Sequence, residues 1–215
     1  MTEQCDLRNT LSIENISKSY SSNKIVSNFS CQFLTGCHAL IGENGSGKST
    51  LLKMICGAEI YDGGNILFDG ISLKESKIDY KKNIGYAPDK LMIYPFLTGS
   101  EFIRMIFSIK GITDKGVFSD ILDGFNIRKY LQYRLDEMSL GNQKKFMLAA
   151  AFIGDPGLLV LDEPTNEIDI ESKNYLISCL LEMKKDKVII FSTHDDNFIS
   201  ALDAKKYNLS DMWRN

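Results

Sequence analysis

The sequence predicts an α/β fold in which a buried parallel sheet is joined to helices, and three features of the chain predict it. Short apolar runs at residues 37–41, 157–161 and 188–193 are typical of strands buried on both faces. A glycine-rich loop follows the first run and leads into a helix with an apolar face. Between residues 89 and 137 glycine turns become rarer and helical periodicity takes over. We therefore expect one domain over residues 1–215, with a helical subdomain at about 89–137 inserted between core strands.

The glycine-rich loop, residues 42–50 with the sequence GENGSGKST, fits the phosphate-loop pattern. Its glycines let backbone N–H groups turn inward around phosphate oxygens, and the helix behind it adds its positive dipole end. Lys48 can reach the β- and γ-phosphates and assist catalysis, and the Ser49 hydroxyl can ligate Mg2+. The residues expected to bind nucleotide are Gly42, Asn44, Gly45, Ser46, Gly47, Lys48, Ser49 and Thr50. The alternative, a chance glycine turn, is disfavoured because the flanking strand and helix also agree.

The segment before the loop alternates apolar and polar residues from about Thr10 to Phe33. This alternation predicts strands of a half-buried sheet. Tyr20 offers a flat ring that can stack on an adenine or pack on its own sheet, and spacing alone does not choose between these.

Short elements and helices fill the middle of the chain. Gly57 predicts the end of the first helix, and residues 65–70 and 83–88 each predict a strand, with a loop and a short helix between them. Thr98-Gly99-Ser100-Glu101 fits a capping box at the start of a helix that Gly111 ends. Two further helices are expected, at 118–125 and 127–135.

The last third alternates helices with strands. Ser139 is a natural N-cap for a helix that runs to about residue 153, and another helix is expected at 169–185. A final strand is expected within residues 205–215.

Polar groups follow two of the buried strands. Asp162 and Glu163 end the run at 157–161, and His194 ends the run at 188–193. With ATP on the phosphate loop, Asp162 can hold Mg2+, Glu163 can accept a hydrogen bond from the attacking water, and His194 can donate to the γ-phosphate. The alternative for the two acids is a solvated turn, and for the histidine an ordinary surface position. His38, inside the strand before the loop, is expected in the core.

Composition limits the class of protein. Lys and Arg total 25 against 28 Asp and Glu, so no basic field for general nucleic-acid binding exists. The N-terminal sequence does not resemble a signal peptide, and no apolar run approaches the roughly 20 residues that span a bilayer. Five scattered cysteines without a C-x-x-C pair indicate reduced thiols in a cytosolic protein.

These motifs together resemble the ATP-binding-cassette (ABC) ATPases, and the resemblance implies a P-loop NTPase core with an N-terminal antiparallel β-subdomain and an inserted helical subdomain. The phosphate loop, the stretch 139–143, the acids Asp162 and Glu163, and His194 occur in that family's order, and the resemblance spans essentially the whole chain. The family's usual Leu-Ser-Gly-Gly-Gln signature here has the form Met-Ser-Leu-Gly-Asn at 138–142. The cofactors implied are ATP and Mg2+.

The resemblance also implies a dimer. Ser139 and Gly141 are expected to bind the γ-phosphate held by a second protomer, so two sites form only in a head-to-tail pair. Residues 166–169 look like the loop that couples the two sites, and Tyr20 looks like the adenine-stacking aromatic.

One position departs from the family. Asp89 stands where the family usually has Gln or, in some exporter branches, Glu, as the side chain that contacts Mg2+ or water and reports nucleotide state to the helical subdomain. Because aspartate is shorter, direct contact of Asp89 with the metal needs movement of its loop.

The stretch 94–102 resembles the exporter branch that is paired with ABC-2-type permeases. This implies a cytoplasmic ATPase subunit held on the inner face of the cell membrane by a separate integral membrane permease. Its docking groove is expected near residues 92–107, with Met92, Tyr94 and Phe96 presented to the partner.

Two other classes compete with this interpretation. A soluble ABC ATPase acting on nucleic acid or ribosomes usually needs a long coiled coil or two cassettes, and neither is found in this sequence. A kinase or GTPase is disfavoured because the acids are consecutive and no Asn-Lys-x-Asp guanine reader is found. We therefore expect an ATPase without a nucleic-acid partner.

Overall fold

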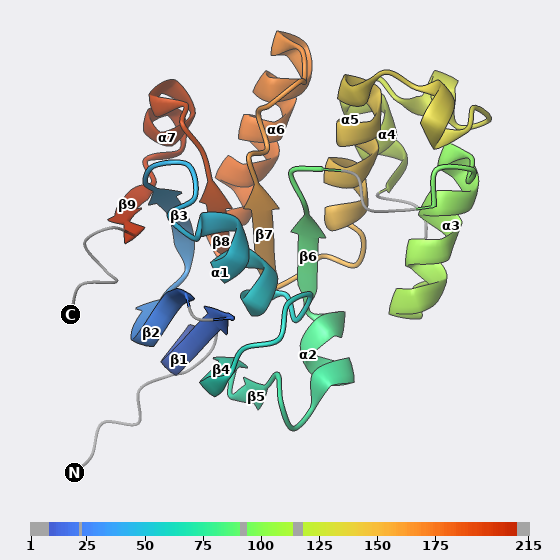
Figure 1. The fold of residues 1–215 in the computed structure, drawn as a ribbon. Helices are drawn as coiled ribbons and strands as arrows, with labels where there is room; N and C mark the ends of the chain where they lie inside the picture. The colour runs from blue at the N-terminus through green and yellow to red at the C-terminus, as the bar shows by residue number, and fades with distance from the viewer. Residues whose placement is uncertain (1–8, 22, 91–93, 114–117, 210–215) are drawn as a thin grey trace.

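The computed structural model describes residues 9–21, 23–90, 94–113 and 118–209. Its centre is a five-stranded parallel sheet with the order β6-β7-β8-β3-β9 (Figure 1). The strands are β3 (Gly36–Ile41), β6 (Ile84–Ala87), β7 (Leu158–Asp162), β8 (Val188–Ser192) and β9 (Lys205–Asn208). The predicted parallel strands and the predicted final strand are therefore confirmed.

A second sheet is antiparallel and has the order β2-β1-β4-β5. Its strands are β1 (Leu11–Tyr20), β2 (Asn23–Phe33), β4 (Gly63–Phe68) and β5 (Ile71–Ser72). This sheet confirms the predicted N-terminal antiparallel β-subdomain. It also contains β4 and β5, the two strands that follow the first helix.

Side chains of the parallel sheet alternate between two apolar cores. In β7, Leu158 and Val160 join the antiparallel sheet, α1 (Lys48–Ile55) and α2 (Lys77–Lys82) in one core. Leu159 and Leu161 belong to the other core. Strands that are buried on both faces need apolar residues at every position, and this is why the continuous apolar run at 157–161 predicted a buried strand correctly.

The remaining helices contribute to the second core. They are α3 (Gly99–Lys110), α4 (Phe118–Gly124), α5 (Leu140–Ala151), α6 (Ile170–Met183) and α7 (Asp196–Leu202). α3 and α4 lie between β6 and β7 in the chain, where the sequence predicts the inserted subdomain. Their apolar side chains merge with those under the sheet, so the subdomain's boundary stays a prediction. None of the helices in the described part of the chain is long and apolar enough to cross a membrane.

Caps at the helix starts follow the sequence. Thr98 and Glu101 form the predicted capping box of α3, and Gly111 ends that helix with φ 67°. The Ser139 hydroxyl accepts a hydrogen bond from the Asn142 N–H at the start of α5. These short-range signals are confirmed because each is satisfied within one helical turn.

The helix predicted at 127–135 is wrong. Only a 3-10 turn, Arg128–Tyr130, forms there, with a second at Leu135–Glu137. The backbone between them pairs with the segment at the start of α3, since Gly99 N donates to Tyr133 O, Ser100 N to Leu131 O and Leu135 N to Leu97 O. Tertiary pairing therefore overrides the helical pattern. Helix α7, which was not predicted, is capped by Asp195, whose carboxylate accepts from the Phe198 N–H.

Candidate active site

The phosphate loop joins the carboxyl end of β3 to the start of α1, as predicted. Gly42, Gly45 and Gly47 have φ values of 149°, 82° and 94°, which glycine adopts without strain. A Cβ on Gly42 would lie 2.9 Å from Ser46 Oγ, so the loop is too tight for a larger residue there.

Helix α1 begins without a capping side chain and has no acidic residue in its first turn. By contrast, side chains cap α3, α5, α6 and α7. An uncapped helix N-terminus behind a glycine loop presents backbone N–H donors and a positive dipole end, which fits an anionic phosphate.

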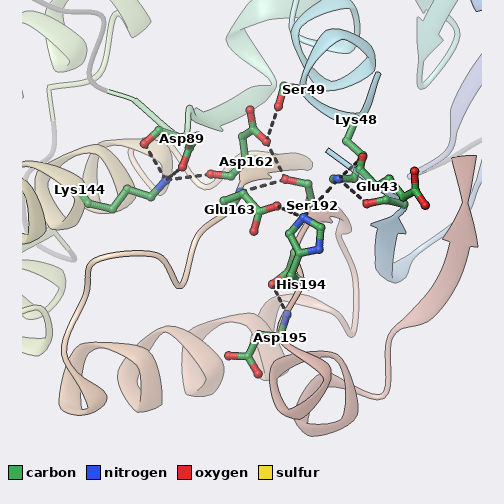
Figure 2. Close-up of polar contacts among 12 residues, drawn as sticks. Glu43, Lys48, Ser49, Asp89, Lys144, Asp162, Glu163, Ser192, His194 and Asp195 are labelled. Atoms are coloured by element: carbon green, nitrogen blue, oxygen red, sulfur yellow. Dashed lines mark hydrogen bonds and ion pairs between the residues drawn. The ribbon is translucent and has the colours of Figure 1, made fainter. Parts of the chain in front are cut away.

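Lys48 is buried, and its ammonium bends back over the loop. Its Nζ donates to Gly42 O at 2.7 Å and to Glu43 O at 3.2 Å, and it lies 3.4 Å from His194 Nε2 (Figure 2). The loop carbonyls therefore hold a positive charge close to where phosphates would sit.

Asp162 and Ser49 meet across the site. The buried Asp162 carboxylate accepts from Ser49 Oγ at 3.1 Å and from Ser192 Oγ at 2.6 Å (Figure 2). A hydroxyl and a carboxylate at this separation form the hard-oxygen donor set that Mg2+ prefers. The residues present therefore fit the ion.

Ser192 was not singled out from the sequence. Besides donating to Asp162, its hydroxyl accepts from the Glu163 N–H at 2.9 Å. The parallel register pairs Asp162 with Ser192, so both side chains lie at the same edge of the sheet. A polar residue at the end of a buried strand is the signal that could have found it.

Glu163 turns out of β7 with φ 44°, in the left-handed region. Its Oε1 lies 3.6 Å from His194 Nε2, and the glutamate side chain is 14% exposed against 56% for the histidine. Burial raises the pKa of Glu163 above its ordinary value of 4.5, while His194 and Lys48 partly oppose the shift. A carboxylate with a raised pKa next in the chain to Asp162, whose donor set fits a metal ion, suits a general base.

Asp89 lies at the edge of this cluster, just past β6. Its carboxylate Oδ1 is 4.0 Å from Lys144 Nζ, and the side chain is 35% exposed. Lys144, on α5, was not singled out from the sequence either. Burial lowers the pKa of its ammonium, and Asp89, Asp162, Glu163 and Glu167 act against that shift.

The structure does not bring the signature residues into this cluster. Within the described residues, no hydrogen bond joins Ser139 or Gly141 to the phosphate loop. Ser139 is exposed at the start of α5, and a Cβ on Gly141 would lie 2.4 Å from Glu167 O. Asp169 caps α6 and forms an ion pair with Lys145, which fixes the loop at 166–169 against α5.

Tyr20 lies at the end of β1. The residue is 46% exposed, and Lys18 Nζ lies 4.7 Å from its ring centroid. An exposed ring is available for stacking, as the adenine prediction requires. His38 is buried as predicted, with Nε2 2.6 Å from Leu34 O.

Comparisons with known proteins agree on one family. The family model described as "ABC transporter" matches residues 27–166. The chain is 30% identical over 189 residues to the linearmycin resistance ATP-binding protein LnrL of Bacillus subtilis strain 168, covering 86% of the chain and 61% of the relative. It is 31% identical over 189 residues to Nod factor export ATP-binding protein I of Rhizobium etli, covering 86% of the chain and 60% of the relative.

A solved structure described as an ATP-binding subunit of an ABC transporter superposes with a TM-score of 0.82 at 27% identity, covering 89% of this chain and 82% of that one. The chain spans about three fifths of the length of the two bacterial relatives.

Proposed function

The chain belongs to the ABC transporter family of ATP-binding proteins, and we propose that it binds and hydrolyses ATP to drive export through a separate membrane permease. The observation that carries this proposal is the convergence of Lys48, Ser49, Asp162, Glu163 and His194 at one edge of the parallel sheet. Export rests on the two relatives whose names specify linearmycin resistance and Nod factor export.

Each residue of the cluster has a place in the reaction. The loop N–H groups and Lys48 bind the phosphates, and Lys48 exchanges its present carbonyl acceptors for phosphate oxygens. Ser49 and Asp162 would hold Mg2+, which neutralises charge on the phosphates when bound. Ser192 keeps the Asp162 carboxylate and the Glu163 backbone in place.

Hydrolysis then needs a base next to the γ-phosphate. The carboxylate of Glu163 takes a proton from water as the water oxygen bonds to the γ-phosphorus and the bond from that phosphorus to the ADP oxygen breaks, and this proton then passes to solvent. His194 is close enough to Glu163 to orient it and exposed enough to reach a phosphate oxygen. The products are ADP and inorganic phosphate.

A second protomer completes the site. Ser139 and Gly141 sit at an exposed helix start, and the neighbouring Leu140 side chain is 63% exposed. An exposed apolar residue beside a helix N-terminus suits a surface that closes on another molecule. In this proposal the α5 N-terminus of one protomer binds the γ-phosphate on its partner.

The membrane partner is proposed to dock in a cavity of about 820 Å3 between α1, α2, β6, α3 and α5. The wall combines apolar side chains with ammonium groups, among them Ile78, Ile106, Ile109, Lys53, Lys81 and Lys110. Such a wall favours a permease segment that carries apolar residues and a carboxylate. Tyr94 and Phe96, which the sequence predicts for docking, are 60% and 58% exposed but do not line this cavity, and Met92 lies outside the described residues. The permease would place the subunit on the inner face of the membrane.

Co-purification from detergent-solubilised membranes tests this assignment. The tagged protein is expected to retain a multi-span membrane protein, and Ile109→Glu to lose it, because Ile109 is 71% exposed on the cavity wall. Leu34→Glu is the matched control, since Leu34 is 58% exposed and does not line the cavity. Equal retention by both variants contradicts docking at this cavity, and no membrane partner for any form contradicts the transport function.

A further inference from the structure

Lys144 is a buried lysine whose three ammonium hydrogens all meet backbone carbonyls. Its Nζ donates to Asp162 O at 2.8 Å, to Pro88 O at 3.0 Å and to Asp89 O at 3.3 Å. The side chain is 4% exposed, so water does not compete for these donors. Figure 2 shows it reaching from its helix toward Asp89 and Asp162.

The carbonyls that Lys144 binds belong to two strand ends. Pro88 and Asp89 directly follow β6, and Asp162 ends β7 just before Glu163. Lys144 itself lies on α5, the helix that Ser139 caps. One side chain therefore joins the signature helix, the segment after β6 and the strand end that carries the proposed base.

Charge adds a second link between the same segments. Asp89 Oδ1 lies 4.0 Å from Lys144 Nζ, and no other ion pair to Asp89 occurs in the described part of the chain. The three carbonyls use all of the lysine's donors, so the carboxylate interacts with it through charge alone. Removing the ammonium would leave Asp89 facing Asp162 and Glu163 without a nearby cation.

We propose that Lys144 is a positioning residue: its ammonium holds Asp89 beside the Asp162 strand end, so that Asp89 influences hydrolysis through Lys144 and without ligating Mg2+. This replaces the direct metal contact that the resemblance implies for Asp89 with an indirect link through Lys144. The inference rests on the proposed ATPase function.

A rescue experiment tests the charge link. Lys144→Met is expected to lower kcat by about 10-fold and change KM for ATP by less than about 2-fold, because the lysine does not lie on the phosphate loop. Adding Asp89→Asn to Lys144→Met should restore kcat by about 3-fold or more, since the double variant no longer has an unpaired carboxylate. If Lys144 acts only by donating to carbonyls, Asp89→Asn gives no rescue, and the proposal is overturned.

Metal dependence of nucleotide binding gives a readout that does not need turnover. A fluorescent ATP analogue is titrated at increasing Mg2+ with the wild type, Asp89→Asn and Asp162→Asn. The Mg2+ concentration for half-maximal binding should shift by less than about 2-fold in Asp89→Asn and by about 10-fold or more in Asp162→Asn. Equal shifts in both variants would make Asp89 a metal ligand and overturn the proposal.

These measurements separate two kinds of failure. Asp89 is partly exposed, so Asp89→Asn should fold even if Lys144→Met does not, and the metal titration then decides. If the wild type itself binds no ATP analogue at any Mg2+ concentration, the proposed function fails, and with it the premise of the inference.

Discussion

The imidazole Nε2 of His194 lies 3.6 Å from the carboxylate Oε1 of Glu163. The two residues follow neighbouring parallel strands, β7 and β8, which place both side chains at the same sheet edge. The histidine is exposed while the glutamate is largely covered, so the base is oriented from the solvent side.

Glu163→Gln should lower ATP hydrolysis by about 100-fold or more while ATP binding persists, because only the proton acceptor is lost. Phosphate release and binding of a fluorescent ATP analogue measure the two effects separately. Lys48→Ala is the contrasting variant and should impair both, since Lys48 is proposed to contact the phosphates. Turnover of Glu163→Gln at the wild-type rate would show that Glu163 is not the base.

The pH dependence of turnover should report Glu163. Burial raises the pKa of Glu163 above 4.5 in the nucleotide-free protein, and a base must be ionised, so kcat/KM for ATP should fall as the pH drops through the raised pKa. The same raised pKa makes the free energy of unfolding fall with rising pH, whereas turnover rises. The stability that Glu163 contributes is fully present below pH 4.5 and is lost as the pH rises through the folded-state pKa. A pH–rate profile of the wild type without an acid limb above pH 4.5 would contradict this.

Tyr20→Ala should weaken ATP binding by about 5- to 100-fold, which corresponds to loss of a base–aromatic stack. Tyr20→Phe should keep the wild-type affinity, because the ring face is retained. Titration with ATP, monitored by calorimetry, compares the three proteins. Wild-type affinity in Tyr20→Ala would mean that the ring packs only on its own sheet and on Lys18.

Lys110 should make stability depend on pH in the alkaline range. Its Nζ donates to Ile84 O and Ile153 O, and burial lowers its pKa from 10.5 to about 8. Between pH 8 and pH 10.5 the unfolded chain binds more protons than the folded chain. The free energy of unfolding of the wild type should therefore rise with pH by up to about 1.4 kcal/mol per pH unit, compared with that of Lys110→Met. Urea unfolding of both proteins at pH 7.5 and 9.5 measures this gain. A difference that does not change with pH would contradict the shifted pKa.

Much of the fold was predictable because its signals are local. The phosphate loop, the buried strand before Asp162, and the caps at Thr98 and Ser139 each depend on residues a few positions apart. The segment 127–135 was mispredicted because its backbone pairs with the residues around Gly99, which no local pattern reveals.

The candidate site residues that belong to a sequence motif could be predicted from the sequence. Those that reach the site through the pairing of distant strands could not. Ser192 acts through its alignment with Asp162, thirty positions earlier in the chain. Lys144 donates to backbone carbonyl oxygens, which have no signature in the sequence. Both residues contact the site only because the folded chain brings the ends of neighbouring strands together.

The mass of Glu163→Gln in solution, measured by light scattering with and without ATP and Mg2+, tests most directly whether two chains close around nucleotide. We expect a monomer alone and a dimer with ATP and Mg2+, and we expect Ser139→Arg in the same background to bind ATP yet stay monomeric. A protein that binds ATP and keeps its monomer mass would contradict closure between two copies of this chain. A protein that binds no ATP would contradict the site itself.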